Sequence, residues 1–119
     1  MDDGDITVTI ENGYSIPNLK VVSINGTMDS ITTRQVDETV FPVIGQENAN
    51  IIFDLSNIDY LSSTGILCLL KYVISFNNQR RLLKFVKPPN HIYNTFVIAG
   101  IAKRFDMYDN LEAAMATLR

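Results

Sequence analysis

The sequence predicts a single α/β domain over residues 1–119, with a mixed β-sheet of four to five strands packed with about four helices. Two observations predict it. Short runs rich in β-branched residues alternate with segments in which apolar residues recur at helical spacing, an order typical of a sheet with helices packed on it. With 46% hydrophobic and 19% charged residues, the chain is long enough to bury one core without disulfides or metals.

Two strands are expected near the N-terminus, at residues 6–10 ("ITVTI") and 19–24 ("LKVVSI"), because both runs are rich in β-branched residues. Turn-forming residues between them favour a hairpin-like connection. Asn25-Gly26 is expected to stop the second strand.

A helix and a third strand come next. In "MDSITTRQVDETVFPVIG" the apolar residues recur near helical spacing, and Asp29 or Ser30 is expected as the N-cap. Pro42 predicts a kink or an early end, because proline lacks the N–H that a helix interior requires. The apolar run at residues 50–55 predicts a strand covered by other elements, with Asp54 near the surface.

The second half of the chain continues this alternation. We expect a deeply packed helix in "GILCLLKYVISF", a strand at residues 81–86, a short helix around "HIYNTFVIAG" that closes at Gly100, and an edge strand in "FDMY". A last helix is expected in "NLEAAMATL", capped by Asp109 or Asn110. Its inward-facing residues are expected to be Leu111, Met115 and Leu118.

Composition and charge exclude several classes of protein. No apolar run approaches the roughly 20 residues of a membrane span, and the acidic opening "MDDGD" is unlike a basic signal peptide, so we expect no membrane insertion and a cytoplasmic location. The basic residues of the second half are scattered without a nucleic-acid motif, so no direct nucleic-acid binding is expected. One cysteine and one histidine are too few for a zinc site, and no metal or cofactor is expected.

Enzymatic motifs are absent as well. The chain has no glycine-rich phosphate-binding loop, no dinucleotide-binding glycine motif and no hydrolase nucleophile elbow, so no catalytic residue is expected. His91 is expected to be a surface or capping residue. Cys68, in an apolar helix, is expected to be a small buried residue and not a reactive thiol.

The stretch "DYLSSTGI" places three hydroxyl residues and a glycine between two apolar runs. A side-chain oxygen there can accept one of the backbone N–H groups that a helix leaves free at its start, and one hydroxyl is enough. Ser62, Ser63 and Thr64 therefore leave two interpretations open: a helix cap alone, or a site where a phosphate is added at the positive end of the helix. Gly65 lets another group approach the backbone closely.

Three segments resemble the STAS family, the domain shared by sulfate transporters and bacterial anti-sigma-factor antagonists. "FDLSNIDYLSSTGILCLLK" resembles the strand, loop and helix of the family signature, "INGTMD" resembles its Gly-x-Leu-Asp turn, and "FVIAGIAKRFDMYDNLEAAMATL" resembles its closing segment. The resemblance covers the chain from residue 6 to the C-terminus and implies the STAS fold.

The resemblance implies an antagonist that binds an anti-sigma factor, itself a serine kinase of the GHKL type, and so frees a sigma factor. In such systems the kinase phosphorylates a loop serine and breaks the complex, and a serine phosphatase restores it. By position, Ser63 matches the phosphorylated serine, with Thr64 as the second choice, and Asp29 matches the acidic residue of the neighbouring loop. The implied partner-binding residues are Asp29, Ser62, Ser63, Thr64 and Gly65.

One position departs from the family pattern, because many antagonists carry Asp before the phosphorylated serine and this chain carries Ser62. Family members with Ser there include scaffolds and sensors. The alternative is therefore a STAS scaffold or sensor module in a signalling or lipid-transport complex, without a kinase switch. A small hydrolase or nucleotide-using protein is a third alternative, from the enzyme class.

Overall fold

The computed structural model describes residues 6–13, 16–45 and 49–119, so the acidic opening residues lie outside the described part of the chain. The elements are β1 (Ile6–Asn12), β2 (Leu19–Met28), α1 (Thr32–Ile44), β3 (Asn50–Leu61), α2 (Ser63–Asn78), β4 (Leu83–Val86), α3 (Asn90–Ile98), η1 (Ala102–Arg104), β5 (Met107–Tyr108) and α4 (Leu111–Ala116).

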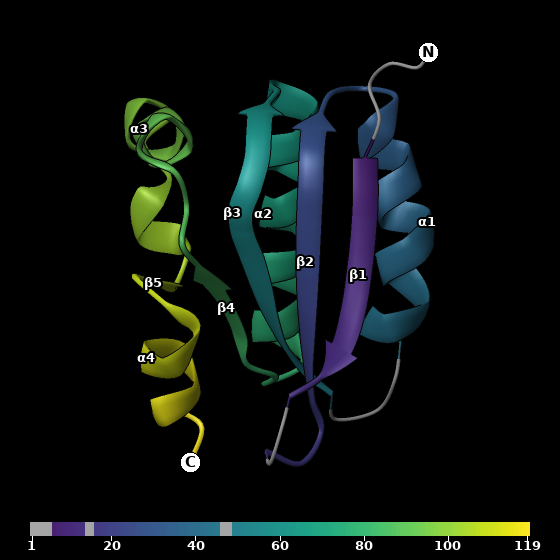
Figure 1. The fold of residues 1–119 in the computed structure, drawn as a ribbon, viewed down its shortest axis with the longest axis vertical. Helices are drawn as coiled ribbons and strands as arrows, with labels where there is room; N and C mark the ends of the chain where they lie inside the picture. The colour runs from purple at the N-terminus through teal and green to yellow at the C-terminus, as the bar shows by residue number, and fades with distance from the viewer. Residues whose placement is uncertain (1–5, 14–15, 46–48) are drawn as a thin grey trace.

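The five strands form one sheet in the order β1-β2-β3-β4-β5 (Figure 1). β1 pairs antiparallel with β2, and each later pair is parallel, so the sheet is mixed. Parallel neighbours need a crossover connection, and α1, α2 and α3 supply the three crossovers. The predicted fold class, an α/β domain with four to five strands and about four helices, is confirmed.

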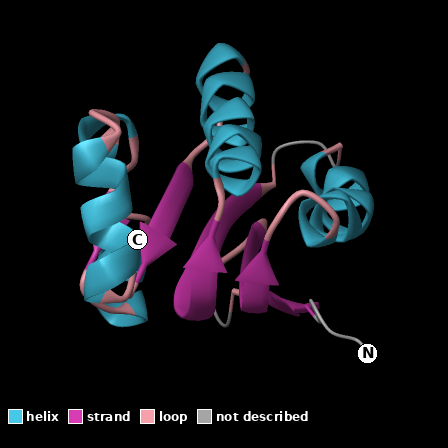
Figure 2. Cartoon of the chain, turned by 90° about the horizontal axis from the view of Figure 1, so that it is seen from above, coloured by secondary structure: helices cyan, strands magenta, loops and turns pink. Residues whose placement is uncertain are grey.

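The main core lies between the sheet and the helices on one of its faces (Figure 2). Phe53 of β3 stacks with Tyr72 of α2 and with Phe85 of β4, at ring-centroid distances of 5.8 and 5.4 Å. The opposite face of the sheet carries a smaller apolar cluster beneath α4. Its buried members are Leu19, Ile52, Val86, Ala114 and Met115.

Strand β2 runs further than the sequence predicts. Asn25-Gly26 does not stop it, and the strand continues to Met28. Two register shifts against β3 lie on either side of Asn25-Gly26, and at each of them β3 carries one more residue than β2. Gly26 has a φ of 121°, a conformation that glycine adopts without the strain of a side chain, so the strand continues through it to Met28.

Strand β3 is also longer than predicted and ends at Leu61 instead of near residue 55. The register shifts change its side-chain periodicity, because Leu55, Ile58 and Leu61 are all buried although they are three residues apart. A regular strand buries every second residue on one face, so the polar residues between these three look like a loop in the sequence.

The ends of three helices test the sequence predictions. Helix α1 does not end at Pro42 but two residues later at Ile44, since in the last turn of a helix a missing N–H interrupts few hydrogen bonds. Helix α3 closes at Gly100 as predicted: φ is 76° there, and the N–H of Gly100 donates to the carbonyl of Val97. In α4 the N-cap is Asn110, whose side chain accepts the N–H of Ala113 at 2.8 Å.

Candidate functional site

Two loops meet where β2 and β3 end. The strands are parallel, so their carboxyl ends lie at the same edge of the sheet, and Met28 is the register partner of Leu61 (Figure 1). The N–H of Ser62 donates to the carbonyl of Met28 at 2.9 Å, which ties the two loops together. The Asp29 loop and the hydroxyl loop, far apart in the sequence, therefore form one site.

The three hydroxyls of the second loop have different roles. Ser62 is the N-cap of α2, and its Oγ accepts the N–H of Gly65 at 3.2 Å. Ser63 is the first helical residue and is exposed, and its hydroxyl has no hydrogen-bond partner within the described part of the chain. Thr64 is exposed as well. The cap and the exposed hydroxyl thus belong to different residues, a point that the sequence left open.

Replacing the cap should cost stability, whereas replacing its neighbour should not. Ser62→Ala is expected to lower the free energy of unfolding by about 0.5–2 kcal/mol, because the N–H of Gly65 loses its acceptor. Ser63→Ala is expected to change it by about zero. Urea unfolding of both variants measures the difference, and a larger loss for Ser63→Ala would contradict the assignment of the cap.

Gly65 packs closely against the ends of β2 and β3, beneath the exposed hydroxyls. It is buried, and a Cβ at this position would lie 2.6 Å from Cδ1 of Leu61 and 3.1 Å from Cβ of Met28. The close approach that the sequence predicts at this glycine is therefore made by the end of β2 and by Leu61. Gly65 lies below the surface, while the other four predicted site residues are exposed or half-buried.

Asp29 organises the neighbouring loop. Its Oδ1 accepts the backbone N–H groups of Ile31 and Thr32, both at 2.9 Å. Asp29 thus holds the turn that leads into α1, but the N-cap position itself is Ile31 and not Asp29 or Ser30 as predicted. The Thr32 hydroxyl also donates to the same oxygen at 3.1 Å. The backbone hydrogen bond from Thr32, together with that from Ile31, lowers the pKa of the Asp29 carboxyl below its ordinary value of 3.8.

This lowered pKa predicts a dependence of stability on pH. The charged Asp29 favours the folded state, so its contribution is complete above the ordinary pKa and is lost as the pH falls through the lower folded-state value. We expect the melting temperature of the wild type to fall more steeply below a pH of about 4 than that of Asp29→Asn, which does not titrate. Equal slopes for the two proteins in thermal melts at acidic pH would contradict this role.

Large exposed apolar side chains lie on the elements that carry the polar centre of the site. Ile31 is 72% exposed, Tyr60 57% and Leu67 61%, and they belong to the start of α1, the end of β3 and the first turns of α2. The candidate site is therefore a polar centre with large exposed apolar side chains on the elements beside it. It has the composition of a surface that seats another protein.

A groove of about 350 Å³ between α1 and α2 adjoins this surface. Thr64 and Leu67 line one wall, and Ser30 and Arg34 line the other. The groove was not predicted from the sequence. The residues that line it recur at helical spacing in the sequence, and this spacing is the pattern from which the groove could have been predicted. On the α1 side they are at positions 30, 33, 34 and 37, and on the α2 side at positions 64, 67, 68 and 71.

His91 and Cys68, two residue types with reactive side chains, lie on the helices that begin beside the site. His91 is exposed at the start of α3, with its Nε2 2.7 Å from the backbone carbonyl oxygen of Asp59 at the end of β3. Cys68 is buried as predicted, and burial raises the pKa of its thiol, which disfavours the nucleophilic thiolate.

The described residues include no helix with the length and apolar character of a membrane span.

The sheet order, the capped loop at the start of α2 and the exposed surface around it define a small α/β domain whose candidate site lies at the carboxyl ends of β2 and β3. The family model described as "STAS domain" matches residues 12–114. The chain belongs to the STAS domain family, as its motifs indicate.

Known proteins with similar sequences or folds include several anti-sigma factor antagonists. The chain is 21% identical over 104 residues to BtrV of Bordetella bronchiseptica, which is named as a candidate anti-sigma factor antagonist, with coverage of 87% of this chain and 90% of BtrV. An anti-sigma factor antagonist from Mycobacterium paratuberculosis has the same fold, with a TM-score of 0.78 and 20% identity over 99% of this chain and 97% of that one. Phosphorylated SpoIIAA of Bacillus superposes with a TM-score of 0.70 and 16% identity, covering 95% of this chain and 100% of SpoIIAA.

Proposed function

We propose that this protein is an anti-sigma factor antagonist. In its unmodified form it binds an anti-sigma factor that is also a serine kinase of the GHKL type, and so frees a sigma factor. Phosphorylation of Ser63 by that kinase ends the interaction, and a serine phosphatase restores it. The protein acts by binding, in the cytoplasm, and none of its residues is assigned a catalytic role.

The position of Ser63 carries this proposal. Ser62 caps α2, so the cap does not need the Ser63 hydroxyl. Ser63 is also exposed. A phosphate there adds about 1.5 to 2 negative charges at the positive end of a helix, where free N–H groups favour an anion. The domain can therefore accept the modification without unfolding, and the new charge acts chiefly on whatever is bound at the surface.

The related proteins support the same interpretation. BtrV is named as a candidate anti-sigma factor antagonist. SpoIIAA is an anti-sigma factor antagonist whose unphosphorylated form and phosphorylated form both have the fold of this chain, at 15% and 16% identity. A phosphorylated and an unphosphorylated state are thus compatible with one fold of this type.

Ser62 bears on the alternative function, a scaffold or sensor without a kinase switch. Serine and aspartate are about equally good N-caps, so the replacement of the family's usual aspartate preserves the cap. The replacement removes one negative charge beside Ser63, and this affects recognition by a kinase more than it affects the fold. The scaffold function becomes the better one if no kinase modifies the loop.

Phosphorylation of the loop is the direct test. Incubation with the organism's candidate anti-sigma kinases and ATP should add one phosphate at Ser63, located by mass spectrometry of the intact protein and its peptides. Ser63→Ala should abolish the modification, while Thr64→Ala should retain it, because Thr64 is the adjacent exposed hydroxyl and serves as the matched control. Phosphate at Thr64 alone, or at no loop hydroxyl, would remove the proposed switch.

A further inference from the structure

Strands β4 and β5 are parallel neighbours, yet the helices that follow them lie on opposite faces of the sheet. Phe85 and Val86 are successive residues of β4 and so point to opposite faces. Helix α3 packs Phe96 into the main core, on the face of Phe85, whereas α4 packs Met115 into the smaller cluster, on the face of Val86. The chain therefore leaves β4 toward one face and β5 toward the other.

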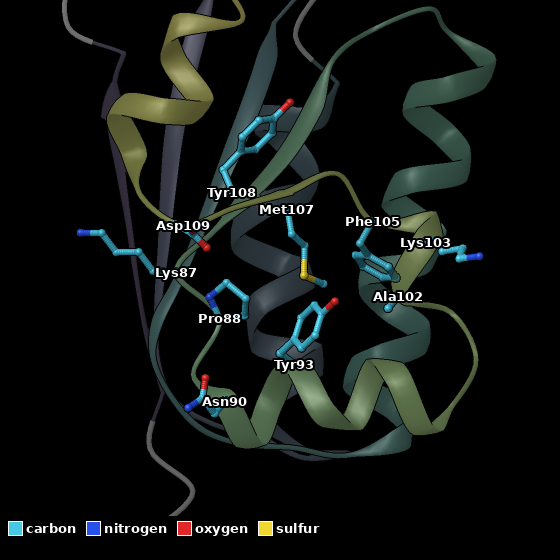
Figure 3. A pocket seen from close by; sticks show the side chains of 10 residues that line it. All are labelled: Lys87, Pro88, Asn90, Tyr93, Ala102, Lys103, Phe105, Met107, Tyr108 and Asp109. Atoms are coloured by element: carbon cyan, nitrogen blue, oxygen red, sulfur yellow. The ribbon is translucent and has the colours of Figure 1, made fainter.

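Such a divergence opens a crevice outside the carboxyl ends of the two strands, and in open α/β sheets this is where ligands bind. The structure has a cavity of about 470 Å³ at this point, between the loop after β4, the start of α3, and β5 (Figure 3). Its volume falls within the range of about 300–1,000 Å³ that is usual for small-molecule sites. None of the residues that line it belongs to the Ser63 loop.

The middle of the cavity is apolar and suits a flat group. In Figure 3 the side chains of Pro88, Tyr93 and Met107 turn toward one another, with Phe105 beside them. Phe105 is 4% exposed and fixed in the core, whereas Tyr93 is 44% exposed although its ring faces this space. An aromatic ring bound here would gain a contact with the Tyr93 ring and a sulfur–aromatic contact with Met107.

The two ends of the cavity differ in charge. Lys87 and Asp109 lie at one end, and Lys103 lies at the other (Figure 3). Asp109 is the one acidic residue among the described residues that line the cavity, so the Lys103 end is positively charged. Lys103 is exposed, and in Figure 3 its amine points away from the other lining side chains. Its flexible four-carbon stem would let it turn over an anion bound at the mouth.

We propose that this cavity binds a small anionic ligand with a flat aromatic body. The ring lies against Pro88, Tyr93 and Met107, and its carboxylate or phosphate is held by Lys103. This site is separate from the proposed switch at Ser63, so the failure of either proposal leaves the other intact.

A titration followed by NMR tests the site with defined probes. Phenyl phosphate and benzoate should each shift the backbone amide signals of residues around the cavity in a saturable manner, with a Kd near 1 mM, as expected for ligands of this size. Inorganic phosphate, which lacks the ring, and benzyl alcohol, which lacks the charge, should bind at least about threefold more weakly. The tighter of the two anionic probes identifies the ligand class as an organic phosphate or a carboxylate.

Variants separate this site from adventitious binding. Tyr93→Ala and Lys103→Gln should each weaken binding of the tighter probe by at least about threefold, with unchanged melting temperatures because both side chains are exposed. Tyr93→Phe should retain binding, and so should Lys20→Gln, which removes the same charge at the start of β2. The proposal is overturned if no probe gives saturable shifts at these amides up to about 10 mM, if benzyl alcohol binds as tightly as the anions, or if Lys103→Gln and Lys20→Gln behave alike.

Discussion

Ser63→Asp is expected to release the anti-sigma partner that the wild type holds, with a loss of affinity of about 30-fold to several thousandfold. The aspartate places a charge on the exposed surface among Ile31, Tyr60 and Leu67, and binding of a partner would bury that charge without a counter-ion. A buried, unpaired charge in an interface costs about 2–5 kcal/mol. Ser63→Ala adds no charge and should bind as the wild type does.

Calorimetric titration against the kinase that modifies Ser63 measures this loss. The melting temperature of Ser63→Asp should stay close to that of the wild type, because an acidic residue suits the first turn of a helix. Ala113→Asp is the matched control: it adds the same charge to the first turn of α4, at the other end of the domain, and should leave affinity unchanged (Figure 1). Equal affinities for wild type and Ser63→Asp would contradict the phosphorylation switch and favour the scaffold function.

Gly65→Val is expected to destabilise the domain by about 1–3 kcal/mol. The added side chain meets Met28 and Leu61, whose atoms already lie 3.1 and 2.6 Å from the position of a Cβ. Both are buried, at 0% and 4% exposure, so neither can move to solvent without opening the core. The start of α2 must shift away from β2 to make room, and this shift would also move the Ser63 loop.

Gly45→Val provides the control for the loss of a glycine. A Cβ at Gly45 would have its nearest neighbours at 3.6 and 3.7 Å, which is ordinary contact, and Gly45 is exposed with a φ of −72°. Its free energy of unfolding should stay within about 0.5 kcal/mol of the wild type. Urea unfolding of the two variants compares them, and similar losses at the two glycines would show that the packing against Met28 is not the cause.

The order of strands and helices was predictable from the sequence, but two strand ends were not. Hydrophobic periodicity places each element, and turn residues such as Gly100 mark where helices close. The same rule fails at Asn25-Gly26, because a glycine inside a paired strand can adopt a positive φ without ending the strand. In β3 the irregular register gives Leu55, Ile58 and Leu61 a spacing that no regular strand has.

The candidate site was predictable in its members but not in their roles. The motif brings Asp29 and the three hydroxyls together, and the parallel ends of β2 and β3 account for that proximity. Which hydroxyl caps α2 depends on backbone geometry, and Ser62 and Ser63 are chemically equivalent in the sequence. The cavity beside β5 was not predictable, because its residues lie between Lys87 and Asp109 with no common spacing and are assembled by the divergence of α3 and α4.

The strand order has a consequence for how the chain folds. Each strand pairs with its neighbour in the sequence, so the described sheet requires no pairing between strands that are distant along the chain. A parallel sheet is ordinarily slow to form, because long loops must close before its strands can pair. Here each closure spans one hairpin or one helical crossover, and its entropy cost is kept small. The sheet can therefore grow by adding one neighbouring strand at a time, and no strand has to wait for a distant part of the chain before it pairs.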